Sequence, residues 1–249
     1  MKLATHVSGS GGRTAVLVHG IMSDSRAWAK VTDELVAHGF RVIAVDLAGH
    51  GRSPRARRYS PKAWADDVLE TIEPMLERAP DLVMGHSLGA LVASMVADRI
   101  APRSAIYVDP AFGFPRGLRG LLLKLAFVFM PRPRRSALVR LNPRWSAQDV
   151  ERELAALREW DKRTIFGLAS TRWLVPPMRV VAPSLVILAE RSFLITKDVA
   201  ARLRSLGMTV VTVPSTGHVV WRDDHEGFMS HVERWLSSSQ SGNPHASAT

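Results

Sequence analysis

One short motif constrains the fold of this chain more than any other feature: Gly85-His86-Ser87-Leu88-Gly89. The motif has the pattern G-x-S-x-G, follows the apolar run 82–84 and precedes a helix-forming run of small residues that begins at Ala90. Where a strand turns this sharply into a helix, the middle residue is strained, and a Cβ on either glycine would clash with neighbouring backbone. The motif therefore predicts a serine hydroxyl raised above the end of a buried strand, beside a helix N-terminus that favours negative charge.

Strand-like and helical runs alternate along the rest of the chain. The apolar, strand-like runs centre on Val16, Ile43, Val83, Ile106, Val186 and Val211. Helical runs are expected at 28–38, 63–77, 90–99 and 197–206. Gly39 and Gly207 stand where C-caps of two of these helices are expected. Such alternation predicts a mostly parallel sheet with helices on both faces.

Several stretches match the α/β-hydrolase superfamily in the order in which that family has them. An apolar strand ends in His19-Gly20, and Trp28 lies eight residues beyond that glycine. The stretch 46–53 follows a second strand, the serine motif comes next, and Thr216-Gly217-His218 follows the last strand. Over about residues 13–236 the chain therefore resembles an α/β-hydrolase. The resemblance implies a mostly parallel central sheet flanked by helices, with a helical cap inserted after the sixth strand.

The alternation of strands and helices breaks once, which suggests how the chain is divided. No convincing strand is expected between 108 and 184, and the helical runs of this interval are 117–129, 146–160 and 162–173. The resemblance implies that 111–178 is the cap, a lid over the site, and that 1–110 and 179–236 form the hydrolase core. The tail 237–249 is Ser-rich with Gly and Pro, and is expected to be disordered.

A neutral serine hydroxyl is a poor nucleophile at pH 7, so Ser87 needs a base. His218 is the expected base among nine histidines, because the superfamily places its catalytic histidine after the last strand. Backbone N–H groups are expected to stabilise the charge on the attacked carbonyl oxygen. The resemblance assigns one to Leu88 and the other to Ile21, with Met22 as the alternative.

The sequence offers more than one residue for the third member of the expected triad. The usual family position for the aspartate, after the strand 184–188, holds Ser192. Asp109 ends the preceding strand, where some family members carry their acid, and it is preferred over Glu190, which lies two residues before the usual position. A site without an acid is the remaining alternative, whereas Asp223 and Asp224 are expected only to start a helix.

These residues predict a serine hydrolase that cleaves a carboxylic ester of a medium-sized apolar substrate through an acyl-enzyme. A lactone or a thioester is an alternative substrate. Acyl transfer, cyclisation, lyase or cofactor-free haloperoxidase chemistry is an alternative reaction, and a non-hydrolytic ligand-binding protein is an alternative class. Because Ser87 is not an aspartate, haloalkane dehalogenase and epoxide hydrolase chemistry is not expected. The expected pocket residues are His19, Gly20, His86, Phe112, Trp145 and Trp160.

Composition restricts the remaining classes of protein. The 249 residues, 46% hydrophobic and 22% charged, suit one globular α/β domain, and the lack of cysteine excludes disulfides. No metal-ligand cluster and no cofactor motif is seen, and without a signal peptide or a transmembrane-length run a cytoplasmic enzyme is expected. The net charge of +10 comes with no nucleic-acid module, so a solvated basic surface is expected. Membrane contact through 116–130 is a minor alternative.

Overall fold

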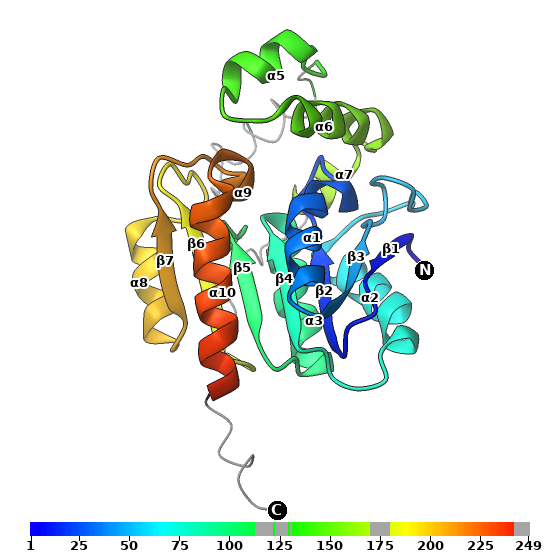
Figure 1. The fold of residues 1–249 in the computed structure, drawn as a ribbon. Helices are drawn as coiled ribbons and strands as arrows, with labels where there is room; N and C mark the ends of the chain where they lie inside the picture. Colours follow the sequence, from blue (N-terminus) through cyan, green and yellow to red (C-terminus); the bar gives the residue numbers. More distant parts are fainter. Residues whose placement is uncertain (113–121, 123–128, 130, 170–179, 242–249) are drawn as a thin grey trace, which may run out of the picture.

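The computed structural model describes residues 1–112, 122, 129, 131–169 and 180–241 of the chain (Figure 1). Strands and helices alternate through most of it, as the sequence predicts. The strands are β1 (Thr5–Ser8), β2 (Arg13–Val18), β3 (Phe40–Val45), β4 (Leu82–His86), β5 (Ala105–Val108), β6 (Ser184–Ala189) and β7 (Thr209–Val213). The helices are η1 (Ser25–Trp28), α1 (Ala29–Ala37), α2 (Pro61–Ile72), η2 (Glu73–Met75), α3 (Leu88–Ile100), α5 (Arg135–Leu141), α6 (Ala147–Glu159), α7 (Thr164–Ala169), α8 (Lys197–Ser205), α9 (Val220–Asp223) and α10 (His225–Ser241).

The described strands form one seven-stranded sheet in the order β1-β3-β2-β4-β5-β6-β7. All pairs from β3 to β7 are parallel, which confirms the six predicted strands and the predicted fold class. The sequence did not predict β1, which pairs antiparallel with β3 at the edge of the sheet. This strand is short and only partly buried, so it carries no continuous apolar run.

Both faces of the sheet are covered by helices (Figure 1). Alternate residues of a strand point to opposite faces. In β2, Val16 belongs to the buried cluster that includes residues of α2, α3 and α8, whereas Leu17 belongs to the cluster that includes residues of α1, α9 and α10. The parallel strands are therefore buried on both sides, which explains why they are apolar along their whole length. Because helices cover both faces, a site formed by several strands is expected at the carboxyl ends of the strands, where the residues that follow them lie close together.

Local sequence signals explain where several helices begin and end. The hydroxyl of Ser60 accepts a hydrogen bond from Ala63 N at the start of α2, and Ser146 forms a capping box with Asp149 at the start of α6. Gly39 and Gly207, after α1 and α8, have φ values of +78° and +89°. The C-cap residues themselves are His38 and Leu206, so each glycine lies one residue beyond the expected position, where left-handed backbone is easily adopted by glycine.

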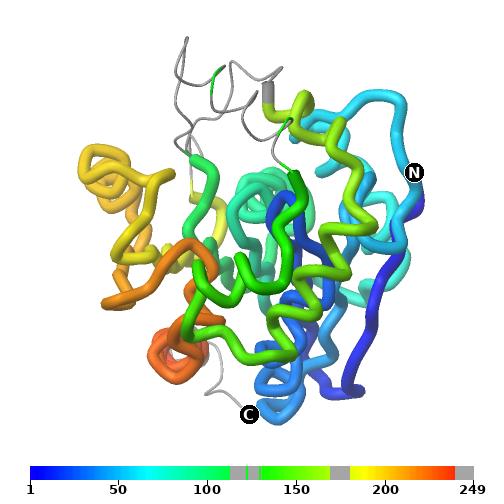
Figure 2. The backbone as a smooth tube through the Cα atoms, turned by 90° about the horizontal axis from the view of Figure 1, so that it is seen from above, coloured from blue at the N-terminus to red at the C-terminus, as the bar shows by residue number. Residues whose placement is uncertain are grey.

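The segment between β5 and β6 leaves the sheet, and α5 and α6 lie beyond the carboxyl ends of the strands (Figures 1 and 2). The sequence predicted this insertion after the sixth strand. In the described chain it follows β5, the fifth strand. The count is lower by one because a single strand, β1, precedes the first parallel strand. Leu138, Leu157 and Ile165 form a small cluster that packs against Ile21 and Met22 of the core. Most of the predicted helix at 117–129 and the end of that at 162–173 lie outside the described residues.

The last helix, for which no range was predicted from the sequence, runs into the expected tail. α10 continues to Ser241 and so includes the first part of the tail that was expected to be disordered, because its apolar face packs on the sheet through Phe228, Val232 and Leu236. Residues 242–249 of the expected tail lie outside the described residues. Among the helices that the structure describes, none has the length and apolar character needed to cross a bilayer.

Candidate active site

The serine motif forms the sharp strand-to-helix turn that the sequence predicts. Ser87 lies between β4 and α3 with φ +54° and ψ −119°, a backbone conformation that L-residues rarely adopt. A Cβ on Gly85 would come within 2.3 Å of the Gly89 carbonyl oxygen, and one on Gly89 within 2.2 Å of the His19 carbonyl oxygen. Both glycines are therefore required for the close approach of β4, α3 and the end of β2.

Ser87 opens onto a cavity of about 500 Å³ at the carboxyl edge of the sheet. His218, in the loop between β7 and α9, lines the same cavity. Most of the remaining wall is apolar and comes from both the core and the segment beyond the sheet, including Ile21, Leu141, Ile165, Leu168, Phe193 and Leu194. The fold thus brings a strained serine and a histidine together in an apolar chamber.

A carboxylate holds the ring of His218. Its Nδ1 lies 2.6 Å from Oδ2 of Asp109, which follows β5 and is fully buried. The other oxygen of Asp109 accepts a hydrogen bond from Ala189 N at 3.3 Å. This confirms the prediction that Asp109 lies within hydrogen-bond reach of His218. Because an ionised Asp109 accepts the Nδ1 proton, Nε2 of a neutral His218 is left free to accept another.

The two alternative positions for an acid are engaged elsewhere. The Glu190 carboxylate accepts a hydrogen bond from Ser215 N at 3.0 Å. Ser192 stands where the family aspartate was expected, and its hydroxyl accepts hydrogen bonds from Leu194 N and Ile195 N at 3.3 and 3.2 Å. In this geometry Glu190 and Ser192 stabilise their own loops, whereas Asp109 contacts the histidine.

The expected backbone donors lie at the wall of the cavity. Leu88 is the first residue of α3, where an N–H group has no partner inside the helix. Ile21 and Met22 line the same cavity after β2, and Met22 has φ +67°. Met22, Ser87 and Asp109 are all non-glycine residues with positive φ, so backbone strain concentrates around this site.

His86, inside the motif, is held against the loop of the other histidine. Its Nε2–H donates to the carbonyl oxygen of His218 at 2.9 Å, and the two ring centroids lie 4.5 Å apart. The edge of the His86 ring also meets Trp221. Burial, together with the nearby His218, lowers the pKa of His86 well below its usual value, so its ring stays neutral.

Of the expected pocket residues, His86 lines the cavity in the described part of the chain, and the others have different surroundings. Nδ1 of His19 donates to Gly20 O and its Nε2 accepts from Leu47 N, so this buried ring fixes the loop after β2. A Cβ on Gly20 would come within 2.8 Å of His86 Nδ1, so this glycine allows close packing of that loop on the serine turn.

Three aromatic residues expected in the pocket have neighbours outside the cavity lining in the described part of the chain. Phe112 is buried beside Tyr107, with ring centroids 5.5 Å apart. Trp160 is buried and donates to Thr164 Oγ1 at 2.7 Å. Trp145 donates to Asp223 Oδ1 at 3.1 Å. These three rings pack between helices and strands of the protein. The residue type alone does not distinguish such packing from contact with a substrate.

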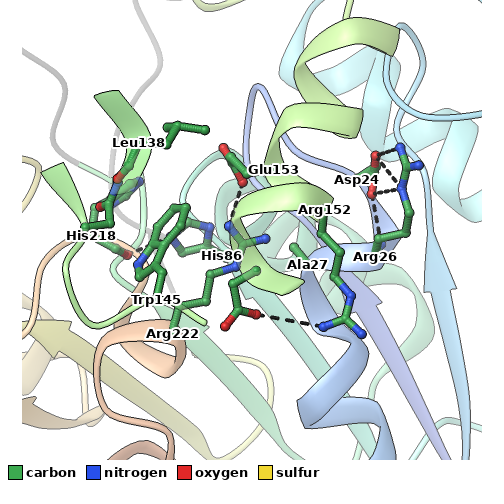
Figure 3. Close-up of polar contacts among 12 residues, drawn as sticks. Asp24, Arg26, Ala27, His86, Leu138, Trp145, Arg152, Glu153, His218 and Arg222 are labelled. Atoms are coloured by element: carbon green, nitrogen blue, oxygen red, sulfur yellow. Dashed lines mark hydrogen bonds and ion pairs between the residues drawn. The ribbon is translucent and has the colours of Figure 1, made fainter. Parts of the chain in front are cut away.

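A buried ion pair in the cavity wall was missed by sequence reasoning. Nη1 of Arg222, on α9, lies 2.6 Å from Oε2 of Glu153, on α6, and both residues line the cavity. The guanidinium also covers the ring of Trp145, 4.6 Å from its centroid (Figure 3). Nε of Arg222 is buried without a hydrogen-bond partner within the described residues. Arg222 and Glu153 are 69 positions apart, and nothing in the sequence indicates that they form an ion pair.

One surface group has the composition of a metal site. Ligand atoms of Glu34, His38 and Glu233 lie within 4.8 Å of one another, from α1, the residue after it, and α10. Nε2 of His38 and Oε1 of Glu233 are 3.8 Å apart, which is an ion pair when the histidine is protonated. None of these residues lines the cavity around Ser87.

Comparison with known proteins decides the family. The model of the alpha/beta hydrolase family matches residues 15–230, which include the serine turn, Asp109 and His218. The chain belongs to the alpha/beta hydrolase family. Among solved structures, this alpha/beta hydrolase is similar to E-2-(acetamidomethylene)succinate hydrolase, with TM-score 0.78 and 24% identity over 94% of this chain and 95% of that one. It is also similar to a marine microorganism esterase, with TM-score 0.74 and 21% identity over 94% and 99% of the two chains.

Curated relatives match a shorter part of this alpha/beta hydrolase. A pimeloyl-(acyl-carrier protein) methyl ester esterase of Sodalis glossinidius is 39% identical over 101 residues, 40% of this chain and 36% of that protein. An uncharacterized protein of Mycobacterium tuberculosis is 40% identical over 96 residues, 38% of this chain and 27% of that protein. The chain thus matches less than two fifths of the length of either relative.

Proposed function

We propose that this protein is a serine hydrolase that cleaves a carboxylic ester of a medium-sized, largely apolar substrate. The observation that carries the proposal is the 2.6 Å contact between His218 Nδ1 and Asp109, with His218 and Ser87 in the wall of one cavity. A nucleophile, a base and a group that orients the base are the parts required for acyl transfer through a covalent intermediate.

In the proposed reaction Ser87 Oγ attacks the ester carbonyl carbon while its proton passes to His218 Nε2. Asp109 stabilises the imidazolium that forms and fixes its tautomer, because its carboxylate accepts the Nδ1 proton. His218 then gives the proton to the leaving alcohol, which departs as an ester C–O bond breaks. Water then attacks the acyl carbon while its proton passes to His218. The bond between the acyl carbon and Ser87 Oγ breaks, His218 returns the proton to Oγ, and the acid leaves.

We assign the oxyanion contacts to the backbone N–H groups of Leu88 and Ile21, with Met22 as the alternative to Ile21. Leu88, Ile21 and Met22 line the same cavity as Ser87, and Met22 has the uncommon φ of +67°. Each such donor is worth roughly 3–4 kcal/mol of transition-state stabilisation in other acyl-transfer enzymes.

The choice of an ester substrate rests on the chamber and on the names of similar proteins. A cavity of about 500 Å³ with a mostly apolar wall suits a medium-sized apolar acyl or alkyl group. Similar proteins are named esterases, and the thioesterase domain of the curacin pathway has the same fold. A lactone or a thioester would use the same groups.

We further propose that α5, α6 and α7 belong to a cap over the site. Leu141 and Asn142 of α5 and its C-cap, Glu153 of α6, and Ile165 of α7 line the cavity together with Ser87. The cap supplies a wall of the chamber from outside the sheet. We therefore expect changes at the cap residues that line the cavity, such as Leu141 and Ile165, to alter substrate preference more than the chemical step.

Hydrolysis of p-nitrophenyl esters of graded acyl chain length, with a panel of lactones beside them, tests this function. Turnover should be highest for medium acyl chains and should be abolished in Ser87→Ala. A matched control is Ser94→Ala, because Ser94 also lies on the α3 side of the motif but its hydroxyl donates to Leu91 O within that helix. Ester turnover that persists in Ser87→Ala would refute the proposal.

A further inference from the structure

Asp223, the last residue of α9, contacts two different parts of the protein at once. Its Oδ2 accepts a hydrogen bond from Gly217 N at 2.6 Å, and Gly217 immediately precedes His218. Its Oδ1 accepts a hydrogen bond from the indole Nε1 of Trp145 at 3.1 Å. One carboxylate therefore joins the backbone beside the candidate catalytic histidine to the segment that starts α6.

The loop that carries His218 is held from several directions. Asp109 contacts its ring, His86 donates to its carbonyl oxygen, and Asp223 accepts from the preceding N–H group. Ser215, in the same loop, has φ +58°, which is uncommon for a residue with a side chain. A loop with a strained residue keeps one conformation only when its surroundings fix it.

The cap supplies part of that fixation. Arg144 Nη1 donates to Ser215 O at 3.0 Å, and Trp145 donates to Asp223. Farther along α6, Glu153 pairs with Arg222, whose guanidinium covers the Trp145 ring (Figure 3). The cap segment 144–153 thus contacts the chain between 215 and 223 at several points, and these points flank His218.

A carboxylate is a stronger acceptor than a neutral group, and two donors share this one. If the cap moved away from the core, Asp223 would lose the hydrogen bond from Trp145 Nε1, and its orientation toward Gly217 would be less restricted. The position of the histidine would then be less defined, although Asp109 and Ser87 would be unchanged. Small displacements of a catalytic group lower the rate of the chemical step far more than they lower substrate affinity.

We propose that Asp223 and Trp145 are positioning residues, which couple the docking of the cap to the placement of His218. This inference rests on the proposed function, since it assigns them a role in the same reaction. It explains why a tryptophan expected in the substrate pocket donates instead to a carboxylate beside the histidine loop. It also gives the cap a role in the chemical step besides forming a wall.

Two conservative variants test the coupling. Trp145→Phe keeps an aromatic ring under Arg222 but removes the indole N–H, and Asp223→Asn keeps the shape but leaves the amide able to accept only one of the two bonds. Each variant should lower kcat for p-nitrophenyl acetate about tenfold with little change in KM, because so small a substrate contacts little of the cap. The control is Glu159→Gln, which weakens a different contact of α6 with the core, the Arg26–Glu159 ion pair at 2.5 Å.

A second readout does not depend on turnover. In protein labelled with ¹⁵N-histidine, the His218 resonances, assigned by their loss in His218→Gln, report the Nδ1 hydrogen bond of that ring. Trp145→Phe and Asp223→Asn should shift these resonances and the acid limb of the pH–rate profile, whereas Glu159→Gln should shift neither.

The results separate the inference from the function on which it rests. Unchanged kcat and unchanged His218 resonances in both variants, or effects no larger than those of Glu159→Gln, would overturn the positioning role. If the wild-type protein hydrolyses no ester but the His218 resonances still shift as expected, the proposed function fails while the coupling between cap and histidine stands.

Discussion

Asp109 and His218 are 109 positions apart in the chain, yet Oδ2 of the first lies 2.6 Å from Nδ1 of the second. The contact forms because β5 and β7 both end at the carboxyl edge of the sheet, on either side of β6. Asp109 has φ +37° and a fully buried side chain. A buried, strained carboxylate that pairs with a histidine at the rim of a cavity is typical of a functional site.

We predict that Asp109→Asn lowers kcat by a factor on the order of 10³–10⁴, because the amide no longer stabilises the imidazolium and no longer selects the Nδ1–H tautomer. Glu190→Gln should have a mild effect, since its carboxylate accepts a hydrogen bond from the exposed Ser215 N and not from His218. Steady-state kinetics of both variants, with circular dichroism to verify folding, measures this difference. A severe loss of activity in Glu190→Gln, with nearly normal activity in Asp109→Asn, would show that the catalytic acid follows β6 and not β5.

Ser87→Ala and His218→Ala should each reduce ester turnover by several orders of magnitude and leave the fold intact. The two groups act in one proton transfer, so the double variant should be little slower than either single variant. Pre-steady-state and steady-state rates on one p-nitrophenyl ester provide the comparison. Losses that multiply in the double variant would mean that the two residues act in separate steps.

The Arg222–Glu153 pair gives a prediction about stability. The Arg222 side chain is 2% exposed, so Glu153→Leu would leave a buried positive charge without its partner and should cost about 3–5 kcal/mol of unfolding free energy. Arg222→Met combined with Glu153→Leu should restore most of that loss, because well-packed apolar side chains replace buried ion pairs at little cost. Urea denaturation of the two single variants and the double variant measures the coupling. Additive losses would show that the pair does not interact in the folded protein.

Buried histidines should make the protein less stable in acid. Burial, and next the neighbouring His19, lower the pKa of His50 from 6.5 to about 3. In the unfolded chain this ring takes up a proton near pH 6.5, but the folded protein does not bind it until about pH 3. Above pH 6.5, His50 therefore does not lower the unfolding free energy. As the pH falls from 6.5 to 3, His50 lowers the unfolding free energy by about 1.4 kcal/mol per pH unit.

Comparison with His50→Gln isolates this contribution. The unfolding free energy is measured from urea curves at several pH values. Between pH 3 and 6.5 its slope against pH should be smaller in the variant by about 1.4 kcal/mol per pH unit, which corresponds to one proton. Lys62→Gln is a control, because Lys62 is exposed and does not titrate there. A variant with the wild-type slope would mean that His50 is protonated in the folded state.

The sequence predicted the parts of the site that depend on short-range pattern. Ser87 was predicted from its flanking glycines, and the close backbone contacts at Gly85 and Gly89 show why that pattern is restrictive. The placement of His218 followed from its position after the last strand. Asp109 could only be preferred over Glu190, because the choice depends on which strand ends face the histidine, and that is a property of the sheet order.

Features that depend on packing between distant segments were not predictable. Trp145 and Trp160 are large aromatic residues of the kind expected in a pocket wall. In the structure their indole N–H groups donate to Asp223 and Thr164. Arg222 and Glu153 have no local signature, since an isolated arginine and glutamate are ordinary surface residues until α6 and α9 meet. The short edge strand β1 was missed for a similar reason, because its pairing with β3 rather than its own pattern makes it a strand.

The most direct test of the central claim is whether Ser87 is an activated nucleophile. Intact-protein mass spectrometry after treatment with a fluorophosphonate should show one phosphonyl adduct on the wild-type protein, with peptide mapping to Ser87. His218→Ala should react far more slowly, and Ser87→Ala should acquire no adduct. An unmodified wild-type protein, or an adduct that persists in Ser87→Ala, would contradict the account.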